Sequence, residues 1–126
     1  MRVFVVKAFG RFQRQERIED TALCEAIGRA ERGLVDADLG HGLIKQRVAR
    51  IGKGRRGGYR TVIAYRFGDR AIFLFGFAKN DQDNIGDAEL AQYGKRAARL
   101  LSADDDSFDA MIDDRMLREV PYDGEA

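Results

Sequence analysis

The alternation of apolar and polar residues predicts three strands in the middle of the chain. In residues 43–49 basic side chains occur only at odd positions, and in residues 59–67 both arginines, Arg60 and Arg66, occupy even positions. A period of two places successive side chains on opposite faces of a strand. Residues 70–78 are nearly all apolar, which is typical of a strand at the buried centre of a sheet. Gly68 and Asp69 predict a hairpin turn between the second and third strands.

Apolar residues at other spacings predict the elements on either side of these strands. Residues 2–7 are β-branched and aromatic and predict a first strand, which Gly10 interrupts before a short helical segment. Residues 19–32 carry an apolar stripe with a helical period, and Gly33 is suited to end that helix. Residues 87–101 repeat the helical pattern, with acidic residues near the start and basic residues near the end, as the helix dipole favours.

Three connecting segments are rich in glycine or polar residues. Residues 33–42 predict a turn-rich connector, residues 52–58 a flexible basic loop and residues 80–86 a polar turn. Residues 52–57 also match the G-x-G-x-x-G pattern, but the dinucleotide fingerprint needs a strand before it and a helix after it. A strand follows here, so the match does not indicate a dinucleotide site. The order of elements predicts an α+β fold.

The end of the chain differs from the rest in charge. Its 126 residues predict one domain. Residues 103–126 contain nine acidic and two basic side chains, which gives −7 for this tail and +8 for residues 1–102. We therefore expect a basic domain over residues 1–102 and an acidic tail over residues 103–126. Apolar residues between Phe108 and Leu117 predict a short helix in the tail, which Val120 and Pro121 should end.

The chain offers few residues for metal or disulfide chemistry. Cys24 and His41 are the only cysteine and histidine, which excludes an internal disulfide and a zinc site built from nitrogen and sulfur ligands. The consecutive acids at 104–106 are expected to serve as charge at a helix start and not as a metal site. No apolar run approaches the ~18 residues of a membrane span, and the first residues lack a signal-peptide pattern. A cytoplasmic location is therefore expected.

Basic residues are concentrated in the central strands. Residues 43–79 contain ten basic side chains and one acidic side chain, Asp69. Uncompensated like charge destabilises a fold, so we expect an anionic partner in preference to a merely solvated surface. Arginines bind phosphates and aromatic rings stack on bases, a combination used on single-stranded RNA. The residues expected to contact RNA are Arg50, Lys53, Arg55, Arg56, Tyr59 and Asn80.

The sequence resembles a known toxin family over residues 1–101. The segments that carry the resemblance are KQRVAR at 45–50, GGYRT at 57–61 and FGFAKNDQDNI at 75–85. They are similar to the RelE-type toxins of bacterial type II toxin–antitoxin systems, and most of all to the HigB-like branch. The resemblance implies a microbial-RNase-like fold. In that fold an N-terminal strand and helices pack on a mainly antiparallel four-stranded sheet, and a C-terminal helix follows.

The resemblance also implies cleavage of mRNA on the ribosome without a metal or cofactor. In the family the ribose 2′-hydroxyl attacks the adjacent phosphate and leaves a 2′,3′-cyclic phosphate. By motif position, the catalytic residues implied are Lys45, Arg47, Arg60 and Lys79. Arg47 and Arg60 would clamp the phosphate, because guanidinium groups bind it bidentately. Lys45 or Lys79 would act as acid or base, with a pKa lowered by neighbouring cations.

The chain departs from the better-known RelE pattern at two positions. Asn80 stands where the pattern has a second arginine, and Gly86 stands where it has a stacking tyrosine, for which Tyr59 or Tyr65 could substitute. Two alternatives stay open: a ParE-like inhibitor of DNA gyrase, and an RNA-binding module that has lost catalysis. The implied partner is an antitoxin, usually a helix-turn-helix DNA-binding protein. The acidic tail either folds over the cationic face and attenuates it, or caps the core or extends into solvent.

Overall fold

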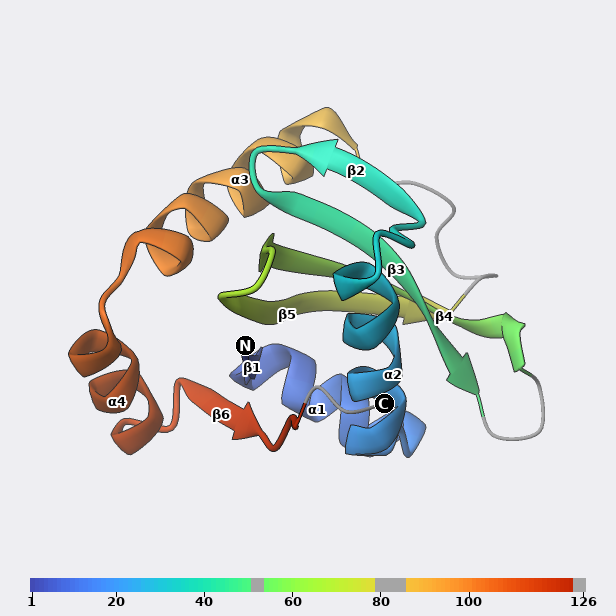
Figure 1. Cartoon of the computed structure of the whole chain (residues 1–126), viewed down its shortest axis with the longest axis horizontal. Coiled ribbons are helices and arrows are strands. Elements are labelled where there is room, and N and C mark those ends of the chain that lie inside the picture. Colours follow the sequence, from blue (N-terminus) through green and yellow to red (C-terminus); the bar gives the residue numbers. More distant parts are fainter. Residues whose placement is uncertain (51–53, 79–85, 124–126) are drawn as a thin grey trace.

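A single sheet with helices on both faces forms the fold (Figure 1). The computed structural model describes residues 1–50, 54–78 and 86–123, and for residues 54–57 it describes the backbone alone. Its elements in chain order are β1 (Arg2–Val6), α1 (Lys7–Glu16), α2 (Asp20–Glu31), β2 (Ala37–Gly40), β3 (Leu43–Arg50), β4 (Gly54–Arg66), β5 (Arg70–Ala78), α3 (Asp87–Ser102), α4 (Asp105–Asp113) and β6 (Leu117–Val120).

The prediction of four strands is wrong. The described residues form a six-stranded mixed sheet in the order β2-β3-β4-β5-β1-β6, in which β1 runs parallel to β5 and the other neighbours are antiparallel. The two missed strands, β2 and β6, have four residues each and occupy the two edges. Such short strands carry too little alternation to stand out. The aspartate and the glycine of β2 indicate a turn, and the residues of β6 continue an apparent helical pattern.

The predicted helices are present, but α4 ends at Asp113 and residues 117–120 form a strand, so the prediction that Val120 and Pro121 end this helix is wrong. α1 begins at Lys7, directly after β1, so Gly10 lies inside a helix and does not end a strand. Gly33 follows α2 with a φ of 82°, as expected of a residue that ends a helix. Residues 54–57 belong to β4 and not to a loop, and the predicted turn at 80–86 falls largely outside the described residues. No helix in the described part is long and apolar enough to cross a membrane.

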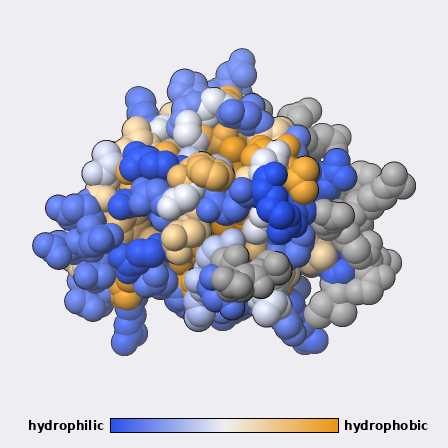
Figure 2. Space-filling view, in the orientation of Figure 1, coloured by the Kyte–Doolittle hydropathy of each residue, from blue (hydrophilic) through white to orange (hydrophobic). Residues whose placement is uncertain are grey.

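The two faces of the sheet are covered by different helices. One face, here called the α1–α2 face, packs Phe73 against Phe9 of α1, with ring centroids 5.1 Å apart. On the same face the buried Gln46 side chain donates to the carbonyl of Ala26 in α2, at 2.9 Å. The other face, the α3–α4 face, packs Phe75 against Tyr93 of α3. Hydrophilic residues cover most of the surface seen in Figure 2, and hydrophobic ones emerge only in small areas.

A glycine in α3 fixes this helix against the tip of the β2–β3 hairpin. His41 sits in the hairpin turn with a φ of 57°. A Cβ added to Gly94 would lie 2.9 Å from the Cβ of His41, which is closer than real Cβ contacts allow. Only glycine therefore lets α3 approach the turn this closely. The hairpin strand that bears Lys45 and Arg47 is thereby held in a defined position beside α3.

The acidic tail caps the core at the end of the sheet formed by β1 and β6. Phe108 of α4 is buried and stacks on Phe4 of β1, with ring centroids 4.6 Å apart. The carboxylates of Asp105 and Glu119 form salt bridges with Arg2, at 3.2 and 2.9 Å. The described part of the tail therefore does not fold over the central cationic strands, and that hypothesis is wrong for residues up to 123. The division of the chain at residue 102 stays a prediction.

Candidate nucleic-acid-binding site

Three of the four predicted catalytic residues meet on the α3–α4 face. Arg47 of β3 lies directly opposite Arg60 of β4, and Lys45 precedes Arg47 by two residues on the same face. Residues opposite each other in antiparallel strands have Cβ atoms about 4.5–5.5 Å apart, and like charges in that position destabilise the pair. We call Lys45, Arg47 and Arg60 the cationic cluster. None of the three forms a salt bridge with a described residue.

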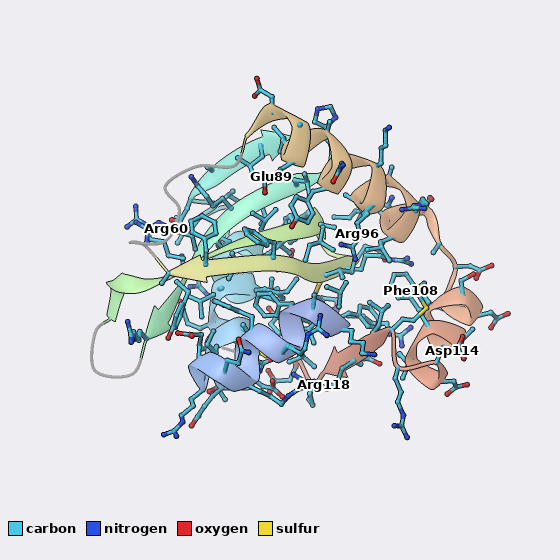
Figure 3. The ribbon with its side chains drawn as sticks, turned by 180° about the vertical axis from the view of Figure 1, so that it is seen from behind. Arg60, Glu89, Arg96, Phe108, Asp114 and Arg118 are labelled. Atoms are coloured by element: carbon cyan, nitrogen blue, oxygen red, sulfur yellow. The ribbon has the colours of Figure 1, made fainter. Side chains whose placement is uncertain are left out.

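The guanidinium of Arg60 includes a donor that no described residue uses. Its Nη1 atom is buried and finds no acceptor among the described residues. An unpaired buried donor costs about 1–3 kcal/mol, and more when it is charged. In Figure 3 the side chain of Arg60 lies at one end of the sheet, at the opposite end from Phe108. The guanidinium is thus placed to receive an oxygen acceptor that this part of the chain does not supply.

The backbone around Arg47 is held by two side chains that sequence reasoning missed. Arg29 of α2 is only 4% exposed, and its guanidinium donates to the carbonyl of Arg47. The carboxylate of Asp36 accepts from the Arg47 backbone N–H at 2.7 Å and also pairs with Arg29. A charged residue in a helical apolar stripe is the only sequence signal for Arg29. Its partners fix the strand position from which the Arg47 side chain reaches solvent.

Gly58 brings β3 and β4 together next to the cluster. A Cβ at this position would lie 2.1 Å from the carbonyl oxygen of Val48, so no other residue fits without a backbone shift. The register between the two strands also shifts between Val48 and Arg50. The glycine directly before Tyr59 is therefore explained by strand packing. The side chains of Arg55 and Arg56, in the same strand, are not described.

An aromatic row adjoins the cluster, and sequence reasoning did not assign it. Phe77 lies opposite Arg60 and Phe75 lies opposite Val62, so both point to the α3–α4 face. Their ring centroids are 5.6 Å apart, and Tyr93 of α3 packs on Phe75 at the same distance. Burial raises the pKa of the Tyr93 hydroxyl, with a smaller contribution from Glu89. The row provides an apolar wall, which strengthens electrostatic interactions made beside it.

The two tyrosines considered for stacking on a base, Tyr59 and Tyr65, lie on the α1–α2 face. The Tyr59 ring is 2% exposed and packs edge-on against Phe12 of α1, and Arg50 lies over it at 5.6 Å. Burial also raises the pKa of Tyr59, with the Glu16 side chain as a second cause. Tyr65 likewise donates to Glu31 of α2, on the α1–α2 face. Neither tyrosine lies on the face that bears Arg60, and the role of Tyr59 in RNA binding stays a prediction.

The remaining predicted residues lie outside the described part of the chain. These are Lys53, Lys79 and Asn80. Across the described residues there is no group of three or more His, Cys, Asp or Glu side chains that could hold a metal ion. What the described part brings together is therefore two arginines, a lysine and an aromatic row, a set suited to bind a phosphodiester and to stabilise negative charge on it.

The fold and the site define a small α+β protein whose sheet carries, on one face, a cationic cluster without an acidic partner among the described residues. A family model described as the RelE toxin of the RelE/RelB toxin–antitoxin system matches residues 1–120. The chain therefore belongs to the RelE toxin family. The match extends through α4 and β6, so the tail up to residue 120 is part of the family pattern and does not lie outside it. A search of curated proteins finds no match to the chain.

Proposed function

We propose that the protein is a metal-independent, ribosome-dependent mRNA endoribonuclease of the HigB-like branch. RelE family toxins typically have this activity, which supports the proposal. The observation that carries it is the pair Arg47 and Arg60, which lie opposite each other with no acidic partner among the described residues. A phosphate group that pairs with both guanidinium groups would relieve their repulsion.

The chemistry follows from the charges available. The 2′-oxygen of the ribose forms a bond to phosphorus, and the bond from phosphorus to the 5′-oxygen of the next nucleotide breaks. The products are a 2′,3′-cyclic phosphate and a 5′-hydroxyl. Arg47 and Arg60 stabilise the charge on the pentacoordinate phosphate. Lys45, on the same face, is one candidate to transfer the proton, and Lys79 is the other.

The partners follow from the same proposal. A RelE toxin implies an antitoxin of the RelB type, and in the HigB-like branch we propose one with a helix-turn-helix DNA-binding domain. The toxin would act in the cytoplasm, on mRNA in the ribosome. Neutralisation by the antitoxin would keep the cationic cluster from reaching RNA.

The test compares Arg60→Ala with Arg66→Ala. Both arginines lie on β4 and point to the same face, but Arg66 forms a salt bridge with Asp69. After brief induction without the antitoxin, mRNA 5′ ends are mapped in cells that carry each variant or the wild-type toxin. We expect wild type and Arg66→Ala to cut within translated frames, and Arg60→Ala to cut about 10²–10³-fold more slowly.

Two results would contradict the proposal. Growth arrest with intact mRNA would exclude the nuclease and point to a target such as gyrase. Cleavage by Arg60→Ala at the wild-type rate would show that the cationic cluster is not the site. Purified Arg60→Ala should keep the thermal unfolding temperature of wild type, which separates lost chemistry from lost folding.

A further inference from the structure

An apolar groove lies on the α3–α4 face, away from the cationic cluster. Its volume is about 310 Å³, and its apolar lining consists of Val6, Leu100, Met111, Met116 and Leu117. The groove lies over β1 and β6, whereas Lys45, Arg47 and Arg60 lie on β3 and β4, with β5 in between. The two regions are therefore separate surfaces of one molecule.

The groove exposes hydrophobic side chains that can adapt to a partner. Met116 is 56% exposed, one of three large hydrophobic residues with this degree of exposure among those described. Met111 lines the same groove from α4. Methionines are flexible and polarisable, and they are common where a protein binds apolar side chains of another chain. This groove is thus suited to receive apolar side chains of a partner.

The rim of the groove is basic. Arg96 and Arg99 of α3 line one side, and neither forms a salt bridge with a described residue. Figure 3 shows Arg96 on the side of α3 that faces the rest of the fold. A second groove shares Val6 and Leu117 with the first and adds Lys7, Arg14 and Arg115. Its acidic lining residue, Glu119, is already paired with Arg2.

We propose that this groove binds an acidic amphipathic helix of the antitoxin, an inference that rests on the proposed function. Such a helix places apolar residues at positions i, i+3 and i+4 in a groove, and its flanking carboxylates would meet Arg96 and Arg99. RNA would bring no apolar side chains to cover Met116. The docking surface for the antitoxin is therefore separate from the residues that contact RNA, and each can be altered without the other.

The binding experiment uses the antitoxin from the gene adjoining that of the toxin, and toxin variants made in an Arg60→Ala background so that they can be purified. Met116→Glu places an acid in the groove, and Phe67→Glu is its control, because Phe67 is 71% exposed on the β4–β5 turn. The double change Arg96→Gln and Arg99→Gln removes the basic rim, and Lys95→Gln is its control on α3. Isothermal titration calorimetry gives the Kd, and thermal unfolding shows that each variant is folded.

We expect Met116→Glu to raise the Kd at least about tenfold, and the double arginine variant to reduce the dependence of Kd on salt. The two controls should bind like the parent. Placed in an otherwise wild-type toxin, Met116→Glu should still cleave mRNA, and the antitoxin should no longer rescue growth. Equal Kd values for all folded variants would overturn the proposal, as would a dimer of the toxin alone that Met116→Glu dissociates.

The two proposals fail in different ways. If the nuclease assignment is wrong, the wild-type toxin leaves mRNA intact while the Kd of Met116→Glu is still raised. If the groove assignment is wrong, mRNA is cleaved normally while the antitoxin rescues Met116→Glu as well as wild type. The Kd and the cleavage map are independent measurements, so each proposal is tested without the other.

Discussion

Two rows of arginines on the same face of the sheet have opposite surroundings. In one row Arg66, Arg70 and Arg2 lie opposite one another across β4, β5 and β1. Here Asp69, Asp105, Asp109 and Glu119 neutralise the charge, and the rings of Phe4 and Phe108 lie beneath two of the guanidinium groups. In the other row Arg47 lies opposite Arg60, and no described acid pairs with either.

The difference indicates that the arginines of the first row stabilise the fold, whereas Arg47 and Arg60 are suited to bind an anion. Arg70 donates to the carbonyls of Leu100 and Ala103, at the end of α3, so its charge also supports a helix terminus. The tail acids in this row all pair with Arg2, whereas Asp69 pairs with Arg66 and Arg70. Among the described residues, acids pair with the first row and none pairs with Arg47 or Arg60, which favours an external anion as the partner of the second row.

The largest loss of stability is expected at Phe108, where the row of Arg66, Arg70 and Arg2, here called the neutralised row, contacts the core. Phe108→Ala removes a ring that is 1% exposed, stacked on Phe4 and covered by Arg70. We expect the free energy of unfolding to fall by about 3–5 kcal/mol. Thermal or urea unfolding measures this, with the exposed Phe67→Ala as control. A loss below about 1 kcal/mol would show that α4 is not an integral part of the fold.

A smaller effect distinguishes the two rows directly. Arg70→Met leaves two carbonyls at the end of α3 without their donor and should cost about 1–3 kcal/mol of stability. Arg60→Met removes a buried donor without a described acceptor and one of two opposed charges, so stability should stay within about 0.5 kcal/mol or rise. Urea unfolding of both variants measures the difference. Equal losses of stability in the two variants would mean that the two rows contribute to folding in the same way.

The smallest effect concerns the pH dependence of the neutralised row. The hydrogen bonds from Arg2 hold the pKa of Glu119 below its usual value. A lowered pKa stabilises the fold above the unfolded-state pKa of about 4.3, and this contribution is lost as the pH falls through the folded-state value. Glu119→Gln should therefore cost about 1 kcal/mol or less at pH 7. The difference from wild type should vanish in acid, and a difference that persists at pH 2–3 would exclude this pair as its cause.

Alternation along the strands was enough to predict the geometry of the cationic cluster. Lys45, Arg47 and Arg60 share a face because their positions have the parity that the sequence predicts and the register aligns them. The same rule argues against Tyr59 as a contact residue, because a neighbour in sequence points to the opposite face. The position of Tyr59 next to Arg60 in the sequence suggests a role in RNA binding, but the alternation of side chains places the two residues on opposite faces of the sheet.

The aromatic row could not be predicted, because a register shift interrupts the alternation in β5. Val62 pairs with Phe75 and Ile63 with Phe73, so Leu74 is an extra residue in the ladder. Without that shift, Phe73, Phe75 and Phe77 would all share one face. The strands β2 and β6 were missed for a different reason. Each is a four-residue strand at an edge of the sheet that forms hydrogen bonds with one neighbour only, so its sequence needs little alternation of apolar and polar residues.

The pairing of β1 with β6 has a consequence for the order in which the protein is made. β1 is synthesised first, yet its antiparallel partner follows about a hundred residues later, and Arg2 and Glu119 are 117 positions apart. Until β6 has left the exit tunnel, one edge of β1 stays open and Phe4 lacks its cover of Phe108. Contacts so distant in the chain form late. The edge of β1 that pairs with β6 therefore stays unpaired while most of the intervening chain is synthesised.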